Sequence, residues 1–97
     1  MVKIEVKYSF PSWIKGIRPE YRTNVIDIFL KENYYRIRNY IFNYQETHDV
    51  LIGFSPNKTG VTLCVKEDNF AYHLADKIRN IRVAMHNDKR MSARIVK

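Results

Sequence analysis

A chain of 97 residues, 45% of them hydrophobic and only three each glycine and proline, can bury one core and is too apolar to remain disordered. The single cysteine, Cys64, excludes an intramolecular disulfide, and no apolar run approaches the roughly 20 residues that span a bilayer. The first residues lack the apolar segment of a signal peptide. We therefore expect one basic α+β domain over residues 1–97, cytoplasmic and without a membrane partner.

The chain is strongly basic. Seventeen Lys and Arg oppose ten Asp and Glu, which gives a net charge of +7. Residues 77–97 contain seven basic residues and one acidic residue, so they carry most of the excess. Small basic domains often bind polyanions, because each phosphate that they neutralise releases counterions. The charge predicts nucleic acid, or an acidic protein, as the partner.

Residues 2–10 alternate apolar and polar side chains, which predicts a half-buried strand that ends at Pro11. The loop that follows, residues 11–19, contains the only tryptophan, Trp13. An isolated tryptophan in such a loop more often covers the core than binds a ligand. We therefore expect Trp13 to close one end of the core.

A first helix is expected to begin at Pro19, which suits the first turn of a helix. Its apolar stripe at helical spacing is formed by Tyr21, Val25, Ile28 and Phe29. The stripe would continue at Glu32, whose carboxylate does not belong on a core face. We therefore expect the helix to end near Lys31, with Asn33 as a left-handed stop.

The segment 34–44, YYRIRNYIFNY, is rich in aromatic and β-branched residues and alternates strictly, which favours a second strand. One face of this strand would combine rings with guanidinium groups. Alternatively, one long helix over residues 20–44 would give the chain the β-α-β-β-α-β order of the ferredoxin-like fold.

The rest of the chain predicts a hairpin, a helix and a short strand. Two largely apolar segments, residues 49–54 and 61–66, flank a turn-forming segment at 55–60 and predict the two strands of the hairpin. From residue 67 a helical stripe runs through Phe70, Leu74, Ile78, Ile81 and Met85. Residues 93–96 are a candidate edge strand. The expected fold is α+β, with a small antiparallel-rich sheet in the order β-α-β-β-β-α covered by two helices.

Two surfaces are candidate nucleic-acid interfaces. On the strand predicted at 34–44, arginines would contact phosphates and rings would stack on bases; the residues are Arg36, Arg38, Tyr40 and Phe42. On the outer face of the second helix, residues at spacings of three and four would form a basic patch; these are Arg79, Arg82, His86 and Arg90.

We therefore expect a non-catalytic protein that binds nucleic acid and prefers RNA or another single strand, because aromatic residues between basic ones suit unpaired bases. The alternative is an inhibitor or antitoxin-type protein that binds a host protein or ribonucleoprotein through the same basic surface. Abundant Ile, Lys, Asn, Tyr and Phe with few Gly and Ala is a bias of AT-rich genomes. It points to a phage or mobile element, and then to the host cytoplasm.

We expect neither a metal nor a cofactor. The sequence has no glycine-rich phosphate loop, no pair of cysteines at zinc spacing and no Ser/His/Asp pattern. The three histidines, His48, His73 and His86, leave a small metal-independent ribonuclease as the catalytic alternative.

Overall fold

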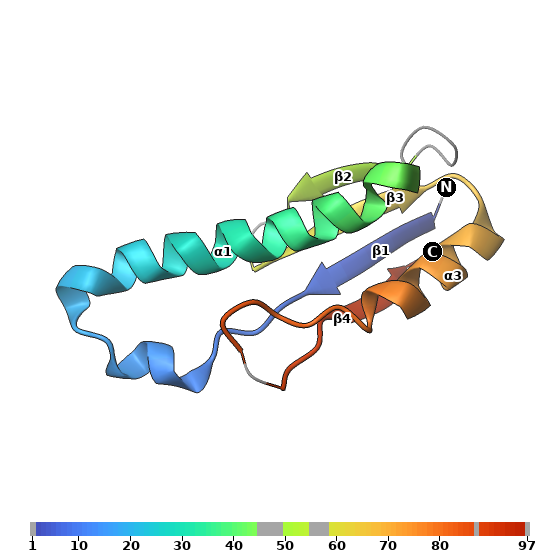
Figure 1. The fold of residues 1–97 in the computed structure, drawn as a ribbon. Coiled ribbons are helices and arrows are strands. Elements are labelled where there is room, and N and C mark those ends of the chain that lie inside the picture. The colour runs from blue at the N-terminus through green and yellow to red at the C-terminus, as the bar shows by residue number, and fades with distance from the viewer. Residues whose placement is uncertain (1, 45–49, 55–58, 87, 97) are drawn as a thin grey trace.

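The computed structural model describes residues 2–44, 50–54, 59–86 and 88–96. In chain order the elements are β1 (Val2–Lys7), η1 (Ser12–Gly16), α1 (Pro19–Ile41), η2 (Phe42–Tyr44), β2 (Leu51–Phe54), β3 (Gly60–Val65), α3 (Asp68–Ile78) and β4 (Ser92–Val96). Within the described residues the two α-helices accompany one four-stranded antiparallel sheet (Figure 1). The predicted α+β class is confirmed.

The sheet has the strand order β2-β3-β1-β4. A row of direct cross-strand partners, the buried Leu63 and Ile4 and the partly buried Ile95, runs from β3 through β1 to β4. On the opposite face β1 exposes Lys3 and Lys7. The helices therefore cover one face of the sheet, and the element order is the β-α-β-β-α-β alternative, that of the ferredoxin-like fold.

Residues 34–44 do not form a strand, so that prediction is wrong. The helix α1 continues for 23 residues to Ile41, and η2 follows it directly. Its buried line is Phe29, Asn33, Ile37 and Ile41, at four-residue steps. Glu32 does not stop the helix, because it is exposed: of the stripe predicted for the core only Phe29 is buried, whereas Tyr21 is 58% and Ile28 52% exposed.

Asn33 is fully buried within α1 and is not a left-handed stop. Its Nδ2 donates a hydrogen bond to the Phe29 carbonyl at 2.8 Å. Its Oδ1 accepts a hydrogen bond from the backbone N–H of Ala84 at 2.7 Å. Burying the amide is tolerable because both ends have partners, and it joins α1 to a segment 51 residues away.

The helix α3 is shorter than expected and ends at Ile78, so the basic face predicted over residues 79–90 is not helical. Met85 adopts a positive φ of 64° and is 36% exposed, outside the core. The chain instead turns back on itself: the Val83 N–H donates to the Lys89 carbonyl, and the Met91 N–H donates to the Ile81 carbonyl. We call residues 81–91 the arginine hairpin; residue 87 within it lies outside the described residues.

Two other predicted elements are confirmed. The strands β2 and β3 pair antiparallel as expected, although residues 55–58 of their connection lie outside the described residues. The candidate edge strand is β4, which pairs with β1.

The molecule is elongated, with principal extents of 45 × 23 × 22 Å. The amino-terminal half of α1 extends beyond the sheet, and η1 lies alongside it (Figure 1). Trp13 in η1 is 47% exposed, so it does not close the core as predicted. In the described part of the chain even the longest helix, α1, is not apolar enough to cross a membrane.

Candidate nucleic-acid interface

The arginine hairpin gathers guanidinium groups from two distant parts of the chain. Arg82 and Arg90 are antiparallel bridge partners, which places their Cβ atoms roughly 5 Å apart. From α1, the Arg36 Nη1 donates a hydrogen bond to the Arg82 carbonyl at 3.0 Å. One residue of the first predicted surface thus joins two of the second. We call Arg36, Arg82 and Arg90 the arginine cluster.

The arginine cluster has an excess of positive charge. None of the described acidic residues forms an ion pair with any of its three members, although the Arg90 Nη1 donates to the Asn80 Oδ1 at 3.3 Å. All three side chains are exposed. Like charges directly opposite each other on paired strands are destabilising. An anion bound between the guanidinium groups would relieve this repulsion.

Arg79 and Arg38 have other positions. At the carboxyl end of α3, the Arg79 Nε donates to the Ala93 carbonyl at 3.0 Å, and its Nη1 pairs with Asp76 at 3.1 Å. Arg79 therefore fastens α3 to β4. Arg38 is exposed, but two residues along a helix turn it about 160° away from Arg36. It lies outside the arginine cluster.

The rings predicted to stack on bases do not form an exposed aromatic surface at the arginine cluster. Tyr40 is half-buried and packs against Tyr44, with ring centroids 6.4 Å apart. Burial, and secondarily Tyr44, raises the pKa of Tyr40. Phe42 is 66% exposed, but it follows the carboxyl end of α1, whereas the hairpin runs from Arg36 toward the amino-terminal half of that helix.

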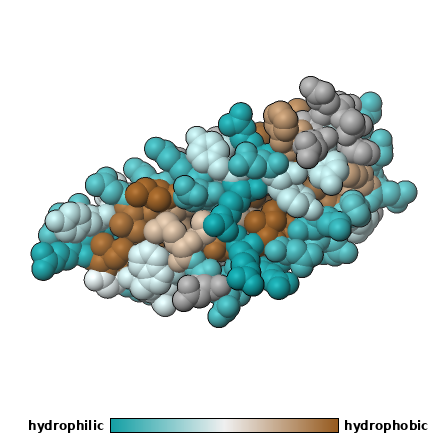
Figure 2. Space-filling model, viewed as in Figure 1, coloured by the Kyte–Doolittle hydropathy of each residue, from teal (hydrophilic) through white to brown (hydrophobic). Residues whose placement is uncertain are grey.

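Different aromatic residues lie next to the hairpin. The Trp13 Nε1 donates a hydrogen bond to the Met85 carbonyl at 3.2 Å, so η1 lies against the hairpin tip. An open groove of about 510 Å³ lies between them, with Phe10, His86 and Lys89 in its wall. Figure 2 shows hydrophilic surface over the hairpin beside hydrophobic surface over η1 and the amino-terminal half of α1.

Sequence reasoning did not place Trp13 and Phe10 beside the hairpin. One signal was present, because the single tryptophan stands in a short loop between Pro11 and Pro19. Its partner, the hairpin tip, is more than 70 residues away and could not be identified from spacing. His86 was named for a helix face but lies in the groove instead.

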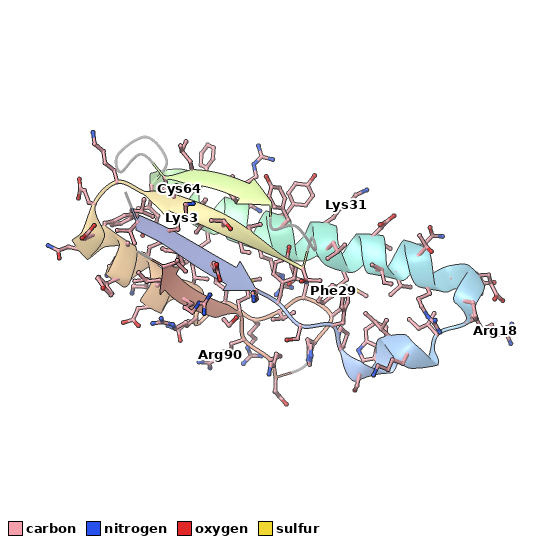
Figure 3. All side chains as sticks on the ribbon, turned by 180° about the vertical axis from the view of Figure 1, so that it is seen from behind. Lys3, Arg18, Phe29, Lys31, Cys64 and Arg90 are labelled. Carbon is pink, nitrogen blue, oxygen red and sulfur yellow. The ribbon has the colours of Figure 1, made fainter. Side chains whose placement is uncertain are left out.

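The open face of the sheet is a weaker candidate. Its described residues form cross-strand rows such as Leu51, Cys64, Lys3 and Val96. Figure 3 shows Lys3 and Cys64 on the adjacent strands β1 and β3. No aromatic residue is among the described residues that point to this face, and Arg94 is paired with Glu5 at 2.7 Å. Among its described residues, the open face of the sheet therefore has basic side chains but no aromatic ones.

The described histidines do not form a catalytic pair. His86 lies in the groove beside Lys89, while His73 lines a separate shallow hollow with Asp76 and Arg79. His48 lies outside the described residues. Among the residues that the structure describes, no group of three or more His, Cys, Asp or Glu could hold a metal ion.

Comparison with protein-family models, curated proteins and solved structures found no match. The case for a function therefore rests on the chain's own residues.

Proposed function

We propose that this protein binds single-stranded nucleic acid, RNA by preference, along the arginine hairpin and η1. The observation that carries the proposal is the arginine cluster, in which Arg36 bonds the Arg82 carbonyl, Arg82 and Arg90 are bridge partners, and none of the three forms an ion pair with a described acid. Guanidinium groups bind phosphate oxygens with paired donors, and phosphate contacts supply most of the affinity of such proteins.

The preference for a single strand follows from the rings beside the cluster. Phe10 is 39% exposed and lines the groove with Lys89. Trp13 is 47% exposed and lines a second open hollow, which shares His86 and Lys89 with the groove and also contains Asp88. Unpaired bases can stack on exposed rings, whereas the bases of a duplex are already stacked on each other. A purely basic surface would suit duplex equally well. The neighbouring rings therefore favour a single strand, and the whole protein's charge of +7 would speed the encounter.

The test is fluorescence anisotropy of a labelled single-stranded RNA at several salt concentrations. The variant Arg82→Ala/Arg90→Ala is compared with Arg38→Ala/Lys66→Ala, which removes the same charge from exposed positions outside the cluster. We expect the first variant to bind at least tenfold more weakly, with a salt slope reduced by about one unit per lost phosphate contact. The second should stay close to wild type.

Equal losses in the two variants would mean that only net charge matters, and would contradict a site at the hairpin. The single tryptophan provides an internal check, since quenching of Trp13 fluorescence by RNA reports on the hollow that Trp13 shares with His86 and Lys89. Running the same samples on a denaturing gel shows whether the RNA is cleaved, which would favour the ribonuclease alternative.

A further inference from the structure

The helix α1 exposes a line of large hydrophobic side chains that the core does not use. Tyr21, Ile28, Tyr35 and Phe42 follow one another at intervals of seven residues and are 58%, 52%, 48% and 66% exposed. These four are among the nine large hydrophobic side chains that the described residues expose. Scattered exposure is normal for a protein surface, but a continuous line of apolar side chains marks a contact surface.

The line is one half of a heptad pattern. The positions that complete it within the helix, also seven residues apart, are Val25, Glu32 and Asn39, of which Val25 is apolar. We call these seven residues the outer seam. A repeat of seven residues is the spacing with which one helix packs along another in a coiled coil, and the seam covers more than three heptads of continuous helical chain.

The outer seam lies away from the sheet. The buried line of Phe29, Ile37 and Ile41 faces the strands, so the seam is on the solvent side of α1. Figure 3 shows this division, with Phe29 on the sheet side of α1 and Lys31 on the side away from it. A partner helix can therefore approach the seam without displacing any packed element.

The charges that flank the seam identify the partner. In a coiled coil the residues beside the apolar seam pair across the interface and decide which helices associate. On α1 the charged flanking positions are Arg22, Lys31, Arg36 and Arg38, all of them basic. Arg22 donates to the Lys15 and Ile17 carbonyls and Arg36 to the Arg82 carbonyl, so the cations that face a partner are Lys31 and Arg38, on one flank. An antiparallel second copy would place these two cations against the same two of its partner, whereas a helix with an acidic flank would place carboxylates against both.

We infer that the outer seam binds an amphipathic helix of another protein, one with an apolar seam of its own and acidic residues on the flank that faces Lys31 and Arg38. Glu32, the single acid within the seam, selects a basic or polar residue at the facing position of that helix. The site is separate from the proposed nucleic-acid surface except at Arg36, whose guanidinium is turned toward the hairpin by its bond to the Arg82 carbonyl.

The test uses three synthetic peptides of equal length and measures their binding to the purified protein by anisotropy. The first has Leu on a heptad seam and Glu on both flanks. The second has the same composition with the heptad order scrambled, and the third has Lys in place of Glu. We expect the first to bind at least tenfold more tightly than the other two. If the scrambled acidic peptide binds equally well, attraction to a protein of charge +7 explains the result and the seam assignment fails.

Variants locate the contact. Ile28→Glu/Tyr35→Glu places two charges in the seam, while Leu51→Glu/Tyr72→Glu makes the same change at two exposed hydrophobic residues elsewhere. The seam variant should lose at least tenfold in peptide affinity, and the control should retain it, with thermal melts confirming that both are folded. RNA binding should be the same in both. Equal peptide affinity in the two variants would overturn the inference.

Sedimentation tests the competing occupant directly. We expect the wild-type protein to remain monomeric over a wide concentration range, because its flanks repel one another. A dimer that Ile28→Glu/Tyr35→Glu dissociates would assign the seam to a second copy of this chain and overturn the inference.

Discussion

The two helices cover the same face of the sheet but use their surfaces differently. In α3 one face is buried through Ala71, Leu74, Ala75 and Ile78, and the residues between them are mostly polar and exposed. In α1 the buried line includes the polar Asn33, and a second, apolar line faces solvent. The helix α3 holds the fold together. The helix α1 does so over its carboxyl-terminal half, and also presents surface.

This difference explains why one helix is easier to recognise than the other. A helix that only packs against the core has its apolar residues in one arc, and this arc is visible in the sequence as a 3.6-residue period. A helix that also exposes apolar side chains to solvent has apolar residues on both sides, so the 3.6-residue period of hydrophobicity is weaker. Between residues 34 and 44, inner residues such as Ile37 and Ile41 and outer residues such as Tyr35 and Phe42 together imitate the alternation of a strand.

The sharpest test of the role of α3 is Leu74→Ala. Leu74 is 1% exposed, and removing most of a fully buried leucine side chain leaves a cavity that costs about 2–5 kcal/mol of unfolding free energy. Urea unfolding followed by circular dichroism measures it. The control is Lys77→Ala, at an exposed position of the same helix, which should change stability by less than about 0.5 kcal/mol. Similar losses in both would mean that α3 is not packed as described.

On α1 the corresponding test is Asn33→Leu, which makes the buried line more apolar. We expect it to destabilise the protein by about 1–3 kcal/mol, because the buried N–H of Ala84 loses its acceptor. Asn39→Leu, the same substitution at an exposed position of α1, should be close to neutral. A gain in stability from Asn33→Leu would show that the hydrogen bond contributes nothing.

A substitution of Trp13 tests whether the aromatic side chains beside the arginine hairpin stack on RNA bases. Stacking of a base on an aromatic ring contributes about 1–3 kcal/mol, so Trp13→Ala should weaken single-stranded RNA binding by roughly tenfold. Trp13→Phe keeps a ring while losing the hydrogen bond to the Met85 carbonyl, and should retain most of the affinity. Anisotropy with single-stranded and duplex RNA measures both. Parallel losses on the two RNAs would count against stacking.

The smallest effect concerns the stability contribution of the outer seam. Ile28→Ser replaces a side chain that is 52% exposed and lies outside the core. It should change the unfolding free energy by less than about 0.5 kcal/mol. Thermal melts compare it with Ile37→Ser, at a fully buried position of the same helix. A loss at Ile28 approaching that at Ile37 would place the seam in the core.

Much of the fold was accessible from local sequence. Alternating apolar and polar residues between turn-forming segments predict the strands β1, β2 and β3. The apolar stripe through Phe70, Leu74 and Ile78 predicts α3. The end of α3 was missed because Ile81 and Met85 continue the helical spacing, although the chain leaves the helix at Ile78. The span of α1 was missed because Glu32 was assigned to the core face, whereas the sheet contacts a face rotated toward Asn33.

The sequence identifies the individual arginines of the candidate site, but not that they lie together in the fold. Arg36, Arg82 and Arg90 were all named from sequence, yet on two separate surfaces. Their convergence depends on the hydrogen bond from Arg36 to a carbonyl 46 residues away and on a hairpin where a helix was expected. Such long-range contacts leave no local pattern, and neither does the pairing of Trp13 with Met85.

The central position of β1 in the sheet has a consequence for how the chain is made. β1 lies between β3 and β4, so one of its edges pairs with residues that follow it by more than 80 positions. During synthesis β1 can pair with β3 while its other edge stays open, an unprotected template for strands of other chains. The sheet closes only when Ser92–Val96 has emerged and docked, so this late, long-range pairing is expected to limit the folding rate.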